Sequence, residues 1–219
     1  MSPVLKSALS WVVTLLVPYI ILMTSVQLML TPLMLQIEYN LPGFPTDPYG
    51  FTTQDRLRWA TPSVMYLTND RGISYLAELF FDDGTPIYNA RELSHMKDVK
   101  DVLQILQRIW YTALAVLIVL AIWARRSNWL DVYNAGWRRG GFLMIGLLIA
   151  VCIFAFTSFM EFFTWFHSLF FTGASWQFAY SDTLIRLFPV VFWQNCFIFV
   201  GVFSLTVALV LIFGLKPKT

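Results

Sequence analysis

Residues 188–215 read FPVVFWQNCFIFVGVFSLTVALVLIFGL and contain no charged side chain. A helix needs about 20 predominantly apolar residues to cross a bilayer, so this run is long enough to span one with some tilt. Three further runs meet the same criterion, at about 8–35, 105–123 and 142–163, so the sequence predicts four transmembrane helices. Pro18 and Pro32 are expected to kink the run at 8–35 or to end it early.

The composition supports a membrane protein. Of the 219 residues, 58% are hydrophobic and only 13% are charged, which is more apolar surface than a soluble domain of this size can bury. The net charge of +2 and the lack of a basic tract argue against a nucleic-acid partner. The first apolar run exceeds the roughly 7–15 residues of a signal-peptide core, and no A-x-A site follows it, so we expect it to be retained.

Seven of the basic residues outside the first long loop indicate the orientation. They lie in the N-terminus, in the loop after the second span and in the C-terminus, and only Asp131 offsets them. Because basic residues concentrate on the cytoplasmic side, both termini are expected in the cytoplasm, with the loops at about 37–104 and 164–187 outside. The basic residues are Lys6, Arg125, Arg126, Arg138, Arg139, Lys216 and Lys218.

The first loop is long enough to fold on its own. A turn-rich segment, LPGFPTDPYG (41–50), precedes a predicted helix at 52–67, capped by Thr52 or Thr53 and broken near Pro62. Residues 73–89 predict a hairpin that turns at Asp83 and Gly84. The expected fold is all-α in the membrane, a single domain (1–219) whose four transmembrane helices carry a small α+β extracellular cap, formed mainly by residues 37–104.

The stretch RELSHMKDVKDVL (91–103) predicts a helix leading into the second span. At 100° per residue, His95 and Glu92 fall inside an apolar stripe, and Asp98 lies at its edge. Routine charges, including Lys97 and Lys100, are expected on the opposite side. An ionisable pair therefore faces the protein body, close to the outer membrane surface.

His167, in MEFFTWFHSLFF (160–171), is the second histidine of the chain and is also expected at the outer interface. Histidine titrates near neutral pH and is the commonest general acid or base, so a shared site with His95 is one interpretation. The alternative is that both are hydrogen-bonded packing residues. No GxSxG, P-loop or HExxH pattern occurs, and no serine or cysteine nucleophile accompanies either histidine, so acid/base chemistry fits better than a covalent intermediate.

The third loop adds further candidates. Asp182 and Arg186 are spaced i, i+4 on a predicted short helix. They are either a surface ion pair or part of a pocket wall, in which Arg186 would stabilise an oxyanion. Trp176 is either an interface anchor or part of an acyl-chain groove, to which Phe170 and Phe171 are further candidates. Cys152 and Cys196 fall within predicted spans, where small buried hydrophobes without a disulfide are expected.

The order of these segments resembles a known family. RELSHMKDVKDVL, FHSLFF (166–171) and DTLIRLFP (182–189), together with DPYGFTTQDRLRWA (47–60) and four spans, resemble the DUF1461 family of bacterial membrane proteins, which includes the lipoprotein intramolecular transacylases. The family's two motif histidines match His95 and His167. The resemblance implies transfer of the sn-2 acyl chain of an S-diacylglyceryl cysteine to its own α-amine. The partners would be a diacylglyceryl-modified lipoprotein and the lipid bilayer of the bacterial cell membrane.

This resemblance assigns roles as a hypothesis. His95 is the general base, oriented by Glu92 or Asp98, and His167 is the partner acid or positions the ester, although the two roles are interchangeable. No cofactor and no metal are expected. The alternative is a metal site formed by His95, His167 and Glu92. A receptor or a lipid-binding or assembly protein is the leading non-enzymatic alternative. A transporter fits less well, because its site would lie near the bilayer midplane.

Overall fold

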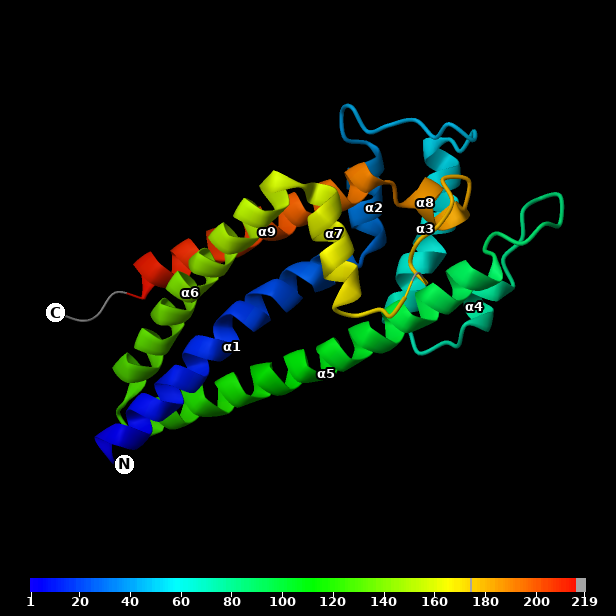
Figure 1. Ribbon diagram of the computed structural model, residues 1–219. Coiled ribbons are helices and arrows are strands. Elements are labelled where there is room, and N and C mark those ends of the chain that lie inside the picture. The colour runs from blue at the N-terminus through cyan, green and yellow to red at the C-terminus, as the bar shows by residue number, and fades with distance from the viewer. Residues whose placement is uncertain (174, 216–219) are drawn as a thin grey trace. The chain divides into compact units, whose positions relative to one another are not determined.

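The computed structural model describes residues 1–173 and 175–215, so the predicted cytoplasmic charges at Lys216 and Lys218 lie outside the described residues. Four helices in the described part are long and apolar enough to cross a membrane (Figure 1). The chain is therefore an all-α integral membrane protein with four candidate spans. These are α1 (Pro3–Met29), α5 (Ala90–Arg126), α6 (Leu130–Thr157) and α9 (Val190–Gly214).

The residues separate into two compact units. Unit 1 comprises Met1–Val26, Leu106–Ser158 and the residues from Ile198 onward, and unit 2 comprises Gln27–Ile105 and Phe159–Phe197. The shorter helices all lie in unit 2: α2 (Pro32–Tyr39), α3 (Thr53–Thr68), α4 (Ser74–Ala77), α7 (Phe159–Ser168) and α8 (Thr183–Leu187).

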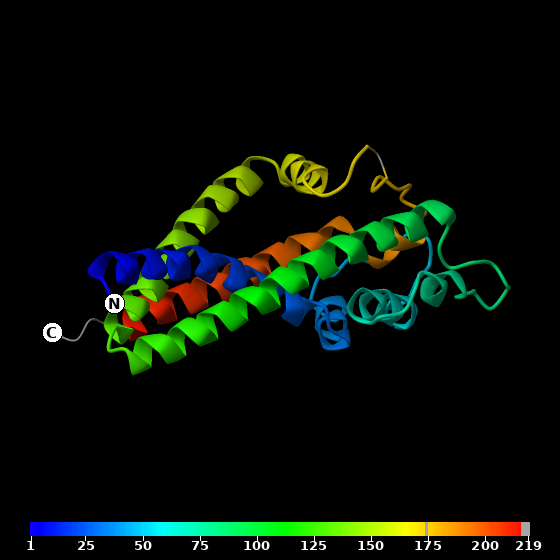
Figure 2. The ribbon, with the colours of Figure 1, turned by 90° about the horizontal axis from the view of Figure 1, so that it is seen from below.

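The first span is shorter than the apolar run that predicts it. Helix α1 ends at Met29, and Pro32 occupies the first turn of a separate helix, α2, capped by the Thr31 side chain. This placement fits proline, which lacks the N–H that a helix interior would need. Helix α5, in contrast, continues without interruption from the histidine-bearing stretch through the second span (Figure 2).

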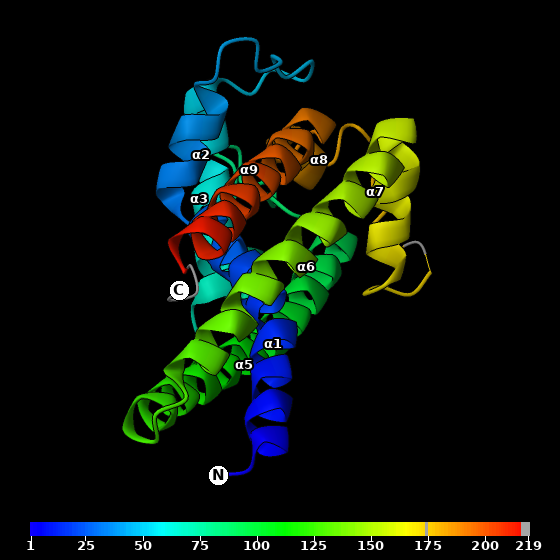
Figure 3. The ribbon, with the colours of Figure 1, turned by 90° about the vertical axis from the view of Figure 1, so that its left-hand side faces the viewer.

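Close packing of α6 on α1 defines unit 1. Figure 3 shows α6 lying over α1 at this contact. A Cβ on Gly140 would lie 2.5 Å from Val17 Cβ, and one on Gly136 would lie 2.6 Å from the Ser10 carbonyl. This small-xxx-small spacing lets two helix backbones approach closely, as in many membrane helix pairs.

Polar groups on these helices find partners on neighbouring helices. The Arg139 guanidinium donates to Ser10 Oγ at 2.6 Å, and the Tyr19 hydroxyl donates to the Leu106 carbonyl at 2.6 Å. The Tyr133 hydroxyl donates to the Leu117 carbonyl at 3.0 Å. Such bonds matter in a bilayer because lipid tails offer no hydrogen-bond partners.

Helix α3 organises unit 2 and packs against α2, α4 and α8 (Figure 1). The Thr52 side chain and Asp55 form a capping box, which confirms the predicted cap. The predicted break at Pro62 is wrong, because the helix continues to Thr68. Burial of Ala60 and Val64 on either side of the proline stabilises the continuous helix.

The structure does not show the predicted α+β cap. The predicted turn is present, with Gly84 at φ 84°, but Phe80 and Pro86 form only an isolated bridge, and no β-strand occurs in residues 1–173 or 175–215. Three backbone amides close this turn: Phe81 donates to the Thr85 carbonyl, Gly84 to the Phe81 carbonyl and Ile87 to the Leu79 carbonyl. Pro86 has no N–H to extend the ladder, and the preceding residues form helix α4 instead.

Lys100 does not face solvent as the helical wheel predicts. It is 5% exposed, and its Nζ donates to the Arg71 carbonyl at 2.6 Å and lies 4.1 Å from the Tyr66 ring centroid. The segment after α3 covers this side of α5, so the ammonium bonds a backbone carbonyl beyond the end of α3. A wheel drawn for α5 alone cannot include that cover.

The α1–α6 contact generates a prediction with a matched control in the same helix. Gly140→Ala is expected to lower the thermal unfolding midpoint in detergent, because overpacking typically costs about 1–3 kcal/mol. Gly146→Ala, where a Cβ meets nothing within 4 Å, should leave the midpoint unchanged or raise it, since alanine favours a helix. Equal midpoints for the two variants would contradict this packing.

Candidate active site

The helix that carries His95 begins with a capping box. The Asn89 side chain accepts hydrogen bonds from the backbone amides of Arg91 and Glu92, each at 3.0 Å. In return, Glu92 Oε2 accepts the Asn89 amide at 2.8 Å. This exchange fixes the first turn of α5 and therefore the direction in which His95, one turn later, leaves the helix.

Glu92 also connects α5 to α8. Its Oε1 accepts the backbone amide of Leu184 at 2.7 Å, and the side chain is almost fully buried. The hydrogen bonds of Glu92 thus go to two backbone amides rather than to His95. The carboxylate positions the histidine by fixing the helix under it, not by orienting its ring.

His95 lies in an apolar setting and is 9% exposed. The edges of Phe171 and Phe178 pack against its ring, with centroids at 5.0 and 5.4 Å. Its Nδ1 is buried and accepts or donates no hydrogen bond within the part of the chain that the structure describes. Asp98, the other predicted orienting group, is half-buried on the same helix and forms no bond to this ring nitrogen.

His167 closes the last turn of α7. Its Nδ1 lies 2.8 Å from the Phe163 carbonyl oxygen, which can only accept, so Nδ1 carries the hydrogen. The neutral ring then presents an unprotonated Nε2. The Trp176 ring stacks on the imidazole at a centroid distance of 4.6 Å. Burial lowers the pKa of His167, and the bond to Phe163 offsets only part of that effect.

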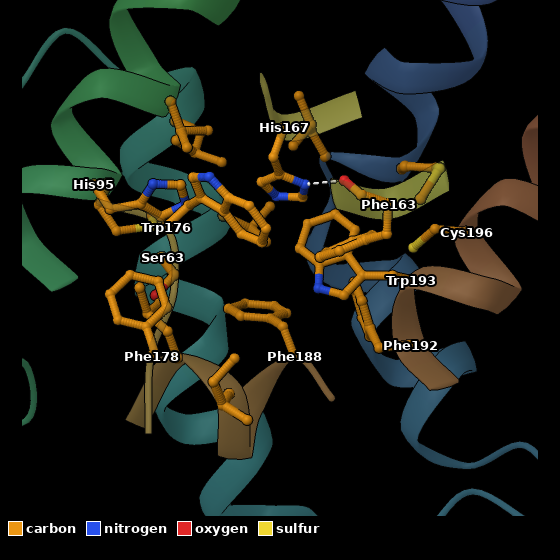
Figure 4. Close-up of a pocket in the computed structure, with 18 residues that line it drawn as sticks. Ser63, His95, Phe163, His167, Trp176, Phe178, Phe188, Phe192, Trp193 and Cys196 are labelled. Carbon is orange, nitrogen blue, oxygen red and sulfur yellow. Dashed lines mark hydrogen bonds between the residues drawn. The ribbon is translucent and has the colours of Figure 1, made fainter. Parts of the chain in front are cut away.

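The two imidazoles lie close together. Their ring centroids are 6.5 Å apart with planes inclined by 25°, and both line one cavity of about 150 Å³ (Figure 4). A single small substrate group can bridge this spacing. The remaining wall is mainly apolar and includes residues of α1, α3, α5, α7, α8 and α9, with Ser63, Phe188 and Trp193 among its members.

The predicted pair of Asp182 and Arg186 is not formed. Asp182 instead accepts from Arg91 at 3.1 Å and from the Ala179 amide at 2.9 Å. Arg91 also lies over the Phe178 ring, at 5.5 Å. Asp182 therefore ties to α5 the loop whose Phe178 packs on His95.

Arg186 lies outside the histidine cavity. Its Nη2 pairs with Asp47 at 2.9 Å and its guanidinium lies 3.4 Å from the Phe51 ring centroid. It lines a second cavity and not the cavity that both histidines line. Asp182 and Arg186 pair with residues of other segments because α8 is short and other segments pack on both sides of it.

The predicted aromatic candidates divide into two groups. Trp176 lines the cavity, and Phe171 packs on both imidazoles without lining it. Phe170 is 38% exposed and contacts Phe166 and Phe171.

The sequence pattern did not identify several cavity residues. Phe178 was not among the candidate site residues, and Ser63 is recognisable only as a polar residue on the buried face of α3, where its Oγ lies 2.6 Å from the Tyr88 hydroxyl. Cys196 is free and buried, as predicted, and lines the cavity. Cys152 is also free but is exposed, so its predicted burial is wrong.

The metal alternative finds no support in the side-chain geometry. No group of three or more His, Cys, Asp or Glu that could hold a metal ion occurs among residues 1–173 and 175–215. Glu92, the carboxylate proposed for such a site, is engaged by two backbone amides.

Comparison with known proteins shows which solved structures and relatives the chain resembles. The fold resembles the membrane integral lipoprotein intramolecular transacylase Lit from Bacillus cereus, with a TM-score of 0.77 and 19% identity over 96% of this chain and 94% of that one. A histidine-to-alanine variant of that protein gives a TM-score of 0.67 at 17% identity, over 94% of this chain and 90% of the other. An uncharacterized protein of Aquifex aeolicus is 27% identical over 95% of this chain and 94% of its own length.

The sequence profile of one family covers most of the molecule. It is described as lipoprotein intramolecular transacylase Lit and matches residues 11–193, which include both histidines and every helix of unit 2 up to the start of α9. The chain therefore belongs to the lipoprotein intramolecular transacylase family of acyltransferases.

Proposed function

We propose that this protein transfers the sn-2 acyl chain of an S-diacylglyceryl cysteine to the α-amine of the same cysteine. The product is an N-acyl, S-monoacylglyceryl lipoprotein. The observation that carries the proposal is the pair of histidines facing one apolar cavity. Because donor ester and acceptor amine belong to one molecule, the protein needs only to fold the lipid head group and move a proton.

The nitrogen that carries the hydrogen in each imidazole suggests different roles for the two histidines. His167 Nε2 is unprotonated and takes the proton from the attacking amine, which makes His167 the base. As the amide bond forms and the ester C–O bond breaks, the same proton passes to the departing glycerol oxygen. Amine and alkoxide thus exchange one proton through one imidazole, and no external acid is consumed.

His95 has the complementary role of hydrogen-bond donor. Its Nδ1 has no partner, and a buried N–H without an acceptor is costlier than an unpartnered lone pair. The hydrogen therefore belongs on Nε2, where it can donate to the ester carbonyl as negative charge develops. The sequence-based hypothesis named His95 as the base but left the choice between the two histidines open, and we propose the opposite assignment.

The size of the cavity limits what it encloses. About 150 Å³ is below the roughly 300–1,000 Å³ of sites that hold a whole small ligand. We propose that it holds the ester and the adjacent methylenes, while the remainder of each acyl chain stays in lipid. Trp176 and Trp193 would contact the enclosed part.

The proposed orientation follows from the basic residues. With Lys6 and the Arg125–Arg139 region in the cytoplasm, the N-terminal turns of α5 and the segment 37–104 lie outside. That is the side on which a lipoprotein displays its modified cysteine. The proposed arrangement is one membrane domain with an extracellular cap inserted between the first two spans.

Replacing the histidines tests the proposal. His167→Ala is expected to lower product formation by about 10²–10⁴-fold, the range for loss of a general base. His95→Ala is expected to lower it by about 10²–10³-fold, the range for loss of one oxyanion donor. The readout is mass spectrometry of a lipoprotein's N-terminal peptide in a bacterial host that does not N-acylate lipoproteins. Lys97→Ala, which changes an exposed side chain two residues after His95 on α5, serves as the matched control.

The same experiment separates an enzyme from a receptor or assembly protein. If cells with wild-type protein contain no N-acyl, S-monoacylglyceryl peptide, the transacylase proposal is wrong. If both histidine variants give wild-type amounts of product, the activity stands but the assigned site does not.

The rate should also depend on pH in two steps. Below about pH 8 the substrate amine takes up a proton, because an α-amine has a pKa of about 7.7–8.0, so the logarithm of the rate falls with a slope of one. Since burial lowers the pKa of His167, its protonation adds a second unit of slope only below about pH 6.5. A slope of two that begins above pH 7 in single-turnover measurements would contradict His167 as the base.

A further inference from the structure

A second cavity of unit 2 lies against the opposite side of α8. It has a volume of about 360 Å³ and differs in character from the histidine cavity, because charged side chains line it. Ile185 of α8 lines both cavities, so the two cavities are neighbours. The lining comprises Pro45, Thr46, Asp47, Pro48, Tyr49, Arg56, Tyr180, Ile185, Arg186 and Pro189.

The buried carboxylate of Asp47, one of the lining residues, is only partly hydrogen-bonded. The Asp47 side chain is 1% exposed, and its Oδ2 accepts from Arg186 Nη2 at 2.9 Å and from the Phe51 amide at 2.8 Å. Its Oδ1 is buried and accepts no hydrogen bond from residues 1–173 or 175–215. A buried carboxylate oxygen without a donor is costly, which marks this position as one where a ligand donor would be stabilised.

The cavity also carries surplus positive charge. Arg56 Nη1 donates to the Pro45 carbonyl at 2.7 Å and its Nε to the Arg186 carbonyl at 3.2 Å. These bonds leave its charge unneutralised, since carbonyls are not anions, and Asp47 pairs with Arg186 alone. The lining thus suits a ligand that offers a donor to Asp47 and an acceptor to an arginine.

A peptide backbone presents this combination at every residue, because each N–H is followed by a C=O. We propose that the second cavity binds the peptide segment of the lipoprotein that follows the lipidated cysteine. A backbone N–H donates to Asp47 Oδ1, a carbonyl accepts from Arg56 or Arg186, and the rings of Tyr49 and Tyr180 flank the chain. Recognition through the backbone would serve many lipoproteins, whatever their sequence.

The shared wall explains how the two cavities cooperate. The reacting ester lies on one side of Ile185 and the peptide on the other, so the cysteine between them is held from both ends. Such positioning favours approach of the amine to its own ester. The inference rests on the proposed function, since the peptide belongs to the substrate of that reaction.

The test compares two substrates with the purified full chain in mixed micelles. One is an S-diacylglyceryl cysteine that carries a five-residue peptide, and the other is the S-diacylglyceryl cysteine methylamide. Wild-type protein is expected to show a higher kcat/KM for the peptide substrate. Asp47→Asn should lower the ratio of the two kcat/KM values about tenfold, as expected for loss of one charge-assisted hydrogen bond.

Two further variants keep the result interpretable. Asp82→Asn removes the same charge from an exposed pair with Arg58 outside the cavity and should leave the ratio unchanged. Because Asp47 also holds a loop, Asp47→Asn can unfold the chain, in which case Tyr180→Ala decides. Tyr180 is 79% exposed, so its truncation tests the cavity without disturbing a core, and it too should lower the ratio.

The outcomes are distinct. A wild-type protein that converts neither substrate overturns the proposed function, and the inference falls with it. A wild-type protein that converts both with equal kcat/KM, or folded Asp47 and Tyr180 variants with a wild-type ratio, overturns the peptide site alone.

Discussion

The buried carboxylate of Glu92 is the constraint on which unit 2 depends. It accepts one backbone amide at the start of α5 and another at the start of α8, so one side chain fixes the origin of both helices. Burial of a carboxylate is unfavourable unless hydrogen bonds compensate it, and two amide donors supply that compensation. His95 then follows one turn along α5, while Leu184 and Ile185 face the histidine cavity from α8. Loss of these two hydrogen bonds would free the parts of α5 and α8 that line the histidine cavity at the same time.

The sequence predicts the membrane part well because its signal is simple. Long runs that are mainly apolar and carry few charges leave little choice but a spanning helix, and all four were identified. Their ends were less certain, as Thr31 and Pro32 show, because capping is decided by one or two residues. The hairpin failed for a related reason: Gly84 dictates the turn, whereas strand pairing depends on cross-strand partners that a single segment does not reveal.

The candidate site was predicted in part. His95 and His167 stood out because the chain has only two histidines, and the structure brings them to one cavity. The partners of Glu92, Asp182 and Arg186 could not be predicted, since each bonds a residue far away in the sequence. Lys100 illustrates the same limit, because helical periodicity tells which side a residue occupies but not what else covers it. Phe178 and Ser63 owe their importance to tertiary contacts alone.

The bond from His167 to the carbonyl of its own helix has a consequence for the electrostatics of the site. Hydrolases that use a histidine base commonly orient it with a carboxylate, which brings a permanent negative charge beside the ring. Here a neutral carbonyl four residues earlier performs the orientation. The base that we propose would therefore have no buried counter-ion, and the reacting groups would begin and end the proposed cycle uncharged. In a cavity walled by aromatic rings, such a charge-neutral catalyst avoids the solvation cost that an ion would carry near lipid.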